Sequence, residues 1–331
     1  MFAQIDQEQN RISFDYTNIT KQSVQKDYDF HRVFGPTINN QALYDDTFRN
    51  TVARALEGFN VCIFGYGQTG AGKTHTMAGD AKEPGIVRLA VGQIFDHIRS
   101  NPQRMFNIKF SCMEIYDEKI YDLLHERNPV ILMSDPKKKK LAFKGLEEHQ
   151  VSSESEMMEQ VAKGMQGKTM TKNYKHDHSS RSHTVIRIGL EMRDTRAGLD
   201  RVMVASLMMV DLAGSEAAHK NESTKGKAEG ISINKSLLFL KQCIHDLASQ
   251  KKDKSFRNST LTRLLEPSLS GGAAVAVICN MTPVAGDFKV AVDTLDFGSS
   301  ASKIDLGLLK QNVAGDNTEF HKLQELMQAH C

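Results

Sequence analysis

One short segment, Gly67-Gln-Thr-Gly-Ala-Gly-Lys-Thr74, constrains the fold of this chain more than any other feature. It fits the pattern G-x-x-x-x-G-K-[ST], in which glycines let successive backbone N–H groups turn toward one anion. The apolar run Val61–Phe64 precedes it and predicts a buried strand that leads into the loop. The sequence therefore predicts a nucleoside triphosphate site between a strand and a helix. The motif leaves open whether the base is adenine or guanine.

The residues of this loop have separate predicted roles. Lys73 supplies a positive charge for the β- and γ-phosphates, and the Thr74 hydroxyl ligates Mg²⁺. The helix that follows turns the positive end of its dipole toward the anion. The competing interpretation, a glycine-rich turn without a ligand, is disfavoured by the strand before it. The nucleotide-binding residues predicted from the motif are Gly67, Gln68, Thr69, Gly70, Ala71, Gly72, Lys73 and Thr74.

The composition narrows the class of partner. Charged residues make up 25% of the 331 residues, and the net charge is only +2, so no global field favours nucleic acid as a partner. The longest apolar run, Ala273–Cys279, is too short to span a bilayer, and no signal peptide opens the chain. We therefore expect a cytoplasmic protein with neither nucleic acid nor a membrane as its partner.

The cysteines argue against a metal ribbon or a redox motif. There are five, and none forms a C-x-x-C pair. Four of them lie in apolar runs, where a free cysteine acts as a small hydrophobe in a reducing cytosol. These are Cys62, Cys112, Cys243 and Cys279, and the fifth is Cys331.

Strand-like and helix-like segments alternate along the chain, which favours one α/β domain with a mixed sheet covered by helices on both faces. The predicted strands are Tyr28–Phe34, Val61–Phe64, Phe106–Tyr116, Thr184–Glu191, Val202–Asp211 and Ala273–Met281. The predicted helices include Gln41–Leu56, Ser153–Lys163 and Ile231–Leu247. The last of these has apolar residues at intervals of three and four, and they form one helical stripe: Ile233, Leu237, Leu240, Ile244 and Leu247.

Two other segments have simpler interpretations. The lysine run Lys137–Lys140 is interpreted as a solvated loop tip. Near the C-terminus, an apolar stripe begins that is too short to establish a coiled coil. Its residues are Phe320, Leu323, Leu326 and Met327.

Two polar clusters accompany the phosphate-binding loop. Leu207–Asp211 is an apolar strand that ends in an acid, the position of a metal-side carboxylate, and Gly214 follows it where a bare N–H could approach a γ-phosphate. The cluster His178-Ser-Ser-Arg-Ser-His183 gathers hydroxyls, a guanidinium and imidazoles. Alone, these clusters are a strand-end turn and a polar loop.

Taken together, the motifs resemble the kinesin motor domain over roughly Tyr28 to Ile304. They stand in the order found in that family, and the loop pattern is also faintly similar to kinetochore-associated kinesins. The resemblance implies a P-loop NTPase-type mixed central sheet flanked by helices on both faces. It implies a motor domain over residues 1–304, with a neck linker and the start of a neck helix over 305–331. The motifs besides the P-loop are Met113-Glu-Ile-Tyr116, Ser179-Ser-Arg-Ser-His183, Asp211-Leu-Ala-Gly-Ser-Glu216, Ile233-Asn-Lys-Ser-Leu237, Leu261-Thr-Arg-Leu-Leu265 and Ile278-Cys-Asn-Met-Thr-Pro283.

The resemblance also implies an activity: ATP hydrolysis, with Mg²⁺, coupled to plus-end-directed movement along cytoskeletal microtubules, including those of a spindle. Ser179 and Ser180 look like the residues that sense the γ-phosphate and position the attacking water, with Ser180 also on Mg²⁺. Asp211 would act on Mg²⁺ through water. Arg181 and Glu216 would pair only when the site closes. The implied catalytic residues are Ser180, Arg181, Gly214 and Glu216.

The family's other partner is tubulin. Helix Ile231–Leu247 resembles the relay helix at the microtubule face, and a basic segment follows it that would match the acidic tubulin surface in a salt-sensitive way. A homodimer through a coiled coil beyond this chain is a further expectation. The implied microtubule-binding residues are Lys235, Lys241, Lys251, Lys252, Lys254, Arg257 and Arg263.

The chain departs from the family pattern at several positions. It has no opening strand with an R-x-R-P-like element, so the first strand is expected to be missing or substituted, and His75 becomes the main candidate for an adenine contact. His176 stands where an asparagine is usual and Thr260 where a lysine is usual. Pro267 is expected to shorten its helix. These departures keep open an alternative, a non-motile or weakly hydrolysing microtubule-binding module. A P-loop GTPase switch is a third, disfavoured hypothesis.

Overall fold

The computed structural model describes eight stretches of the chain, and every structural statement below concerns these stretches. They are residues 3–17, 23–135, 140–174, 182–194, 202–216, 224–251, 255–282 and 288–313.

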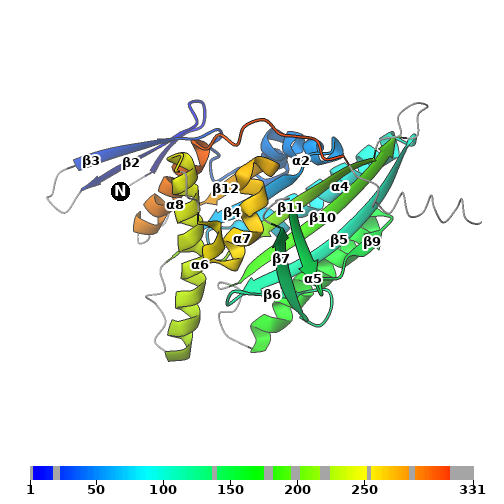
Figure 1. Cartoon of the computed structure of the whole chain (residues 1–331). Helices are drawn as coiled ribbons and strands as arrows, with labels where there is room; N and C mark the ends of the chain where they lie inside the picture. The colour runs from blue at the N-terminus through cyan, green and yellow to red at the C-terminus, as the bar shows by residue number, and fades with distance from the viewer. Residues whose placement is uncertain are drawn as a thin grey trace, which may run out of the picture.

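A mixed sheet of nine strands forms the centre of the molecule (Figure 1). Its order is β12-β4-β11-β10-β5-β6-β7-β8, and the short β9 pairs with β5. The strands β12, β4 and β11 are mutually parallel, whereas β10 runs antiparallel between β11 and β5. Their bounds are β4 Val61–Gly67, β5 Arg104–Tyr116, β6 Lys119–Asp122, β7 Pro129–Asp135, β8 Lys140–Lys144, β9 His149–Val151, β10 His183–Asp194, β11 Val202–Asp211 and β12 Ala274–Asn280.

Helices cover both faces of this sheet because its central strands are apolar on both sides. In the fully buried β4, Ile63 belongs to one core cluster, and Cys62 and Phe64 belong to the other, since alternate side chains of a strand point to opposite faces. On the Ile63 side lie α1 Asn40–Leu43, η1 Tyr44–Phe48, α2 Arg49–Leu56, α4 Ile86–Ser100 and α5 Glu154–Tyr174. On the other side lie α6 Thr224–Ala248, η3 Phe256–Asn258, α7 Thr260–Pro267, η4 Ser268–Gly272 and α8 Phe288–Ser302.

A separate antiparallel sheet of three strands lies beside α8 (Figure 1). Its strands are β1 Ala3–Asp6, β2 Arg11–Thr17 and β3 Ser23–Asp29. Apolar side chains from β2, β3 and α8 form a third core cluster. Beside this cluster, Asp296 of α8 bonds two residues of β3. Its Oδ1 accepts hydrogen bonds from Lys26 Nζ at 2.7 Å and Tyr28 Oη at 3.0 Å.

The outer edge of β12 carries no partner strand among the described residues, because β1 pairs only with β2 in the small sheet. All seven residues of β12 are half-buried, although the neighbouring β4 is fully buried.

Most expected elements are confirmed. β4, β5, β10, β11 and β12 coincide with predicted strands, and the predicted helices are found, with α5 and α6 longer than expected. The predicted strand Tyr28–Phe34 is wrong. Pairing ends at Asp29, and Phe30 and Val33 instead pack against α8 residues without entering a ladder. The C-terminal apolar stripe and Lys137–Lys139 lie outside the described residues, and Lys140 begins β8.

The four cysteines expected to be small hydrophobes are free, and Cys62, Cys112 and Cys243 are buried. Within the described part of the chain, each helix is too short or too polar to cross a bilayer.

Helix α7 contains two of the departures from the family pattern. It ends at Pro267 after eight residues, and the chain continues directly into η4, so the shortening expected from Pro267 stays a prediction. Thr260 is buried, and its Oγ1 donates to the Glu118 carbonyl at 2.7 Å. The position therefore anchors the β5–β6 turn and does not present a side chain to solvent. The helix starts with a capping box, in which Ser259 Oγ accepts from the Thr262 N–H at 3.1 Å.

We expect Ser259→Ala to lower the free energy of unfolding by about 1 kcal/mol, because the Thr262 N–H then loses its cap. Chemical denaturation monitored by circular dichroism measures this. Ser255→Ala is the matched control, since Ser255 is exposed and makes no side-chain cap. Equal losses in the two variants would contradict the proposed role of the cap.

Candidate functional site

Four chain segments meet where the parallel strands of the central sheet reach their C-terminal ends. The parallel strands β12, β4 and β11 end there, and the antiparallel β10 begins there. Gly67 at the end of β4 pairs with Asn280 of β12, while Asp211 at the end of β11 pairs with Thr184 of β10. Asn280 Nδ2 also donates to Thr76 Oγ1 at 3.0 Å, which ties the end of β12 to helix α3, Lys73–Ala78. Polar side chains on all four segments are thereby gathered at one place.

The predicted phosphate-binding loop connects β4 to α3. Gly72 precedes the helix at φ 96°, a left-handed conformation that a side chain would strain. Lys73 is buried, and its Nζ donates to the carbonyl oxygens of Gly67 at 2.8 Å and Gln68 at 2.7 Å. Burial lowers the pKa of Lys73. An anionic phosphate would compensate this buried charge better than carbonyl dipoles do.

The carboxylate of Asp211 is the centre of the site. Its Oδ2 accepts from Thr74 Oγ1 at 2.8 Å and from Lys168 Nζ at 2.9 Å. Its Oδ1 is buried and has no hydrogen-bond partner among the described residues. A hydroxyl and an orphaned carboxylate oxygen are the hard oxygen donors that suit Mg²⁺ and its waters, so the residues fit the implied metal. Thr74 would hold it directly and Asp211 through water.

Lys168 was not predicted from the sequence. It belongs to α5, and its side chain is 8% exposed, as against 9% for Asp211. The two form a buried ion pair that links α5 to the end of β11. A single lysine in a largely polar helix carries no pattern that would indicate burial, because only the packing of α5 on the sheet places it there.

The segment after β11 is hydrogen-bonded to the phosphate-binding loop. The Ser215 N–H donates to the Gly67 carbonyl at 3.0 Å. The Thr69 N–H donates to Glu216 Oε2 at 2.8 Å, and the Thr69 hydroxyl also bonds this carboxylate. A Cβ on Gly214 would lie 2.2 Å from Thr69 Oγ1, so a larger residue here would require the Thr69 and Glu216 side chains to move apart. The structure thus brings Gly214 and Glu216 to the loop, as expected for residues near a terminal phosphate.

The other half of the predicted catalytic set lies outside the described residues. This applies to Ser179, Ser180 and Arg181, and to His176. The pair of Arg181 with Glu216 therefore stays a prediction. In this structure, Glu216 is bonded to Thr69 of the loop.

His183, the first described residue of β10, joins two parts of the site. It is 2% exposed, and its Nδ1 accepts from the Ala213 N–H at 3.0 Å. Its Nε2 lies 2.9 Å from Ser236 Oγ on α6. Burial lowers the pKa of His183 to about 3, so the imidazole is neutral at physiological pH. Since Nδ1 accepts a hydrogen bond, Nε2 carries the proton and donates to Ser236.

His75, expected to contact adenine, lies on α3 near two acidic residues of the segment that follows this helix. Its Nε2 is 3.7 Å from Asp80 Oδ2 and 3.5 Å from Glu83 Oε2. The side chain is 46% exposed, so it remains accessible to a ligand. Contact with a base stays a prediction.

The predicted microtubule-binding residues have diverse surroundings. Lys241 pairs with Asp293 of α8 at 3.1 Å, and Lys251 pairs with the buried Asp246 at 2.7 Å. Arg263 donates to the Leu132 carbonyl at 3.2 Å. Lys235 lies over the Phe239 ring, and Arg257 is exposed in η3. The other two, Lys252 and Lys254, lie outside the described residues.

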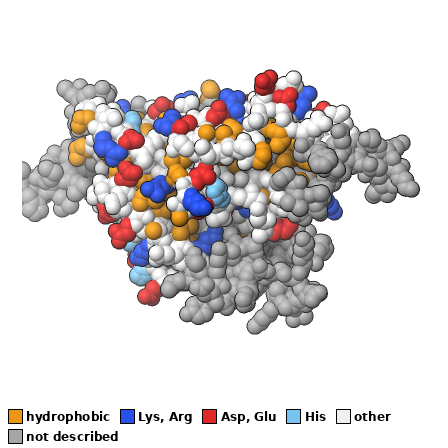
Figure 2. All heavy atoms as spheres, turned by 180° about the vertical axis from the view of Figure 1, so that it is seen from behind, with side chains coloured by type: hydrophobic (Ala, Val, Ile, Leu, Met, Phe, Trp, Pro, Cys, Tyr) orange, Lys and Arg blue, Asp and Glu red, His pale blue; other side chains and the backbone are white. Residues whose placement is uncertain are grey.

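The rear face of the molecule presents no field of one sign. Basic and acidic side chains are interspersed over its described surface (Figure 2). This agrees with the near-neutral net charge.

The chain after α8 returns to the central sheet. The Asn312 N–H donates to the Gly58 carbonyl at 2.9 Å, and the Asn312 carbonyl accepts from the Val204 N–H at 3.0 Å. Gln311 Nε2 donates to the Glu57 carbonyl at 2.8 Å. The described part of the predicted neck-linker segment is thus held between the end of α2 and β11. Its remainder, from residue 314 onward, lies outside the described residues.

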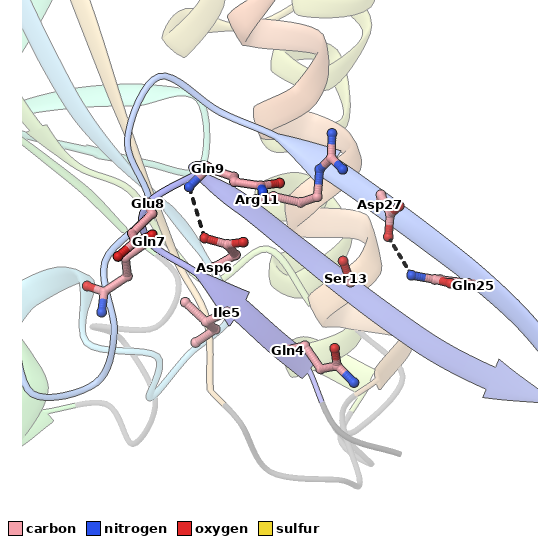
Figure 3. Close-up of a pocket in the computed structure, with 10 residues that line it drawn as sticks. All are labelled: Gln4, Ile5, Asp6, Gln7, Glu8, Gln9, Arg11, Ser13, Gln25 and Asp27. Carbon is pink, nitrogen blue, oxygen red and sulfur yellow. Dashed lines mark hydrogen bonds between the residues drawn. The ribbon is translucent and has the colours of Figure 1, made fainter.

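A hollow of about 550 Å³ lies on the small sheet and does not belong to this site (Figure 3). Its lining comes from β1, the following turn, β2 and β3, and includes Asp6, Arg11 and Asp27. Gln7, which also lines it, already accepts a hydrogen bond from the Gly35 N–H. The phosphate-binding loop contributes no residue to it.

We expect Lys168→Met to lower the free energy of unfolding by about 3–5 kcal/mol, because Asp211 then keeps a buried charge without its cation. Urea denaturation measures the loss. Lys163→Met on the same helix is the control, since Lys163 is exposed, and its effect should stay within about 0.5 kcal/mol. A small loss in Lys168→Met would show that the ion pair is not important for the fold.

Comparison with known proteins agrees with this geometry. The family model described as "Kinesin motor domain" matches residues 2–304. A kinesin-like protein KIN-7K, chloroplastic, of Oryza sativa subsp. japonica is 35% identical over 298 residues, which cover 90% of this chain and 28% of that protein. Kinesin-like protein KIF18B of Homo sapiens is 35% identical over 291 residues, or 86% of this chain and 34% of that protein.

A third relative, kinesin-like protein KIN-7N of Arabidopsis thaliana, is 34% identical over 302 residues, or 90% of this chain and 37% of that protein. The chain therefore spans between 28% and 37% of the length of these relatives. The match covers the phosphate-binding loop, the segment after β11 and α6 alike. The chain belongs to the kinesin motor-domain family.

Proposed function

We propose that this chain is an ATP-hydrolysing motor that moves along microtubules. The observation that carries the proposal is the direct bonding of the segment after β11 to the phosphate-binding loop, through Ser215 to Gly67 and through Glu216 to Thr69. A terminal phosphate that enters the loop must displace or rearrange these bonds. Occupancy of the nucleotide site is therefore converted into movement of a segment that reaches the rest of the domain.

Hydrolysis in such a site depends on positioning and electrostatics. Lys73 turns from the carbonyls of its own loop to the β- and γ-phosphates. Mg²⁺, when bound, neutralises charge on the phosphate oxygens, and Thr74 and Asp211 orient it. The Gly214 N–H lies where a γ-phosphate oxygen could accept from it. Ser180 and Arg181 complete the set, with Arg181 taking Glu216 from Thr69 as the site closes.

The face formed by α6 and η3 is the proposed contact with microtubules. Arg257 of η3 and Lys235 of α6 are exposed cations there, and Lys252 and Lys254 precede Arg257 in the sequence. The acids that pair with Lys241 and Lys251 reduce the local positive charge, so the footprint is weaker than the sequence suggested.

Several finer expectations belong to the same proposal. ATP is the substrate rather than GTP, movement is toward the plus end, and the protein acts on cytoplasmic microtubules, including a spindle. The full-length protein would form a homodimer through a coiled coil beyond this chain. Residues 1–304 would form the motor domain, and residues 305–331 the neck linker and the start of the neck helix. Within that segment, Gln311 and Asn312 bond the end of α2 and β11.

Two observations favour the alternative, a microtubule-binding module with weak turnover. The edge of β12 is open, and Thr260 contributes no charge at the tubulin-facing helix. The neutral side chain at Thr260 would weaken binding to microtubules, and the open edge of β12 would make the sheet less stiff. Neither changes the positions of the residues around Asp211. The two functions differ in the rate of turnover on microtubules.

We expect microtubules to raise steady-state ATP turnover by roughly tenfold or more, and Lys73→Ala to abolish it, because Lys73 is the loop lysine proposed to bind the β- and γ-phosphates. A coupled phosphate-release assay with and without microtubules measures both. Lys82→Ala, at an exposed lysine in the turn after α3, is the control. Turnover that ignores microtubules would favour the alternative, and turnover that survives Lys73→Ala would refute the assigned site.

We expect Arg257→Ala to raise the half-saturating microtubule concentration by about threefold at low salt, because an exposed cation opposite an acidic surface contributes a modest attraction. The difference should shrink as salt approaches about 0.15 M, where charges are screened beyond about 8 Å. The same assay at two salt concentrations measures it. A salt-independent effect would point to packing instead of charge.

A further inference from the structure

Three elements of the fold meet at one imidazole. His183 begins β10, Ala213 follows β11, and Ser236 lies within α6. His183 accepts from the Ala213 N–H at 3.0 Å through Nδ1 and lies 2.9 Å from Ser236 Oγ through Nε2. Both contacts are in the interior, since His183 and Ser236 are each 2% exposed and Ala213 is buried as well.

The donors and acceptors in the two hydrogen bonds of the His183 ring can be assigned in only one way. A backbone N–H can only donate, so Nδ1 must accept and Nε2 must carry the proton. A lysine or arginine in place of His183 could not accept from the Ala213 N–H. An aliphatic side chain could neither accept from Ala213 nor donate to Ser236. A neutral imidazole is the side chain that accepts from one element and donates to another across this distance.

The segment that contains Ala213 is also hydrogen-bonded to the phosphate-binding loop. Two residues after Ala213, the Ser215 N–H donates to the Gly67 carbonyl of the phosphate-binding loop at 3.0 Å. Leu212–Glu216 is therefore fixed between the loop and His183. A shift of this segment toward a phosphate either breaks the Ala213–His183 bond, leaving a buried N–H unpaired, or moves the imidazole and with it the partner on α6.

We propose that His183 is a positioning residue that transmits the state of the phosphate site to α6 through its bonds to Ala213 and Ser236. The proposal rests on the nucleotide binding inferred above and adds the physical link between that site and the proposed microtubule face. The path consists of three hydrogen bonds: loop to Ser215, Ala213 to His183, and His183 to Ser236.

The register of the sheet makes this link stiff. β10 and β11 are paired from Thr184↔Asp211 to Arg193↔Val202, so the backbone at His183 cannot slide along β11. On the other side, Ser236 is part of α6, in which Leu237, Leu240 and Ile244 are buried in the same core cluster. Because the backbone hydrogen bonds of a helix hold successive turns together, a displacement of Ser236 would be carried along α6.

A merely structural role for His183 makes a different prediction. In that case, loss of the Ser236 contact would lower stability and leave communication between the site and α6 unchanged. A variant at Ser236 tests this best, because it breaks the link at the helix end without touching β10, β11 or any residue proposed to contact nucleotide. Alanine is well tolerated in a helix interior, so Ser236→Ala should fold.

The experiment is hydrogen–deuterium exchange with and without a non-hydrolysable ATP analogue and Mg²⁺. In the unmodified chain, the analogue should alter amide exchange in the loop 67–74 and in α6 from Ser236 to Ala248. In Ser236→Ala, the loop response should persist while the α6 response falls by about threefold or more. Ser249→Ala, at the exposed end of the same helix, is the control and should retain both responses.

The outcomes separate this proposal from the motor function. An α6 response in Ser236→Ala equal to that of the unmodified chain overturns the link, as does an unmodified chain whose loop responds while α6 does not. A loop that fails to respond removes nucleotide binding and the link together. If the loop and α6 both respond as expected but microtubules do not change ATP turnover, the link through His183 is supported and the proposed motor function is refuted.

Discussion

The buried carboxylate of Asp211 is the interaction on which the rest of this site depends. It stands at the end of β11 and joins three elements, because its Oδ2 binds Thr74 of α3 and Lys168 of α5. A charge buried to this degree is tolerated only with a cation and a donor in place. The pair therefore fixes α5 against the sheet and leaves Asp211 Oδ1 buried without a partner among the described residues. The following segment, Leu212–Glu216, begins from this fixed point and reaches the phosphate-binding loop.

The central fold could be predicted because its signals are local. β4 and β11 are continuous apolar runs, and α6 has a clear stripe, so composition and periodicity were sufficient there. The phosphate-binding loop could be predicted for a similar reason, since its glycines are needed by the backbone itself. The strand expected over Tyr28–Phe34 failed because apolar residues there pack on α8 without pairing, and periodicity does not distinguish these two forms of burial.

The connections between elements could not be predicted, because they depend on tertiary contacts. Lys168 is indistinguishable in sequence from the exposed Lys163 on the same helix, and only the packing of α5 assigns one to Asp211. His183 and Ser236 were both within recognised motifs, yet no spacing relates a residue of β10 to one of α6. The acidic partners of the basic residues could not be predicted either. Lys241 pairs with Asp293, which is distant in the chain, and Lys251 pairs with Asp246, five residues before it.

The open edge of β12 and the integrity of the site are compatible for a physical reason. β12 contributes to the site through its end, where Asn280 pairs with Gly67 and binds Thr76, and these contacts lie on the side of β4. On its opposite side, β12 has no neighbouring strand among the described residues. Both faces of β12 are packed, with Ala276 and Ile278 against one core cluster and Val275 and Val277 against the other. An unpaired outer edge therefore reduces the stability of the sheet margin, while the hydrogen bonds that position the phosphate-binding loop remain intact.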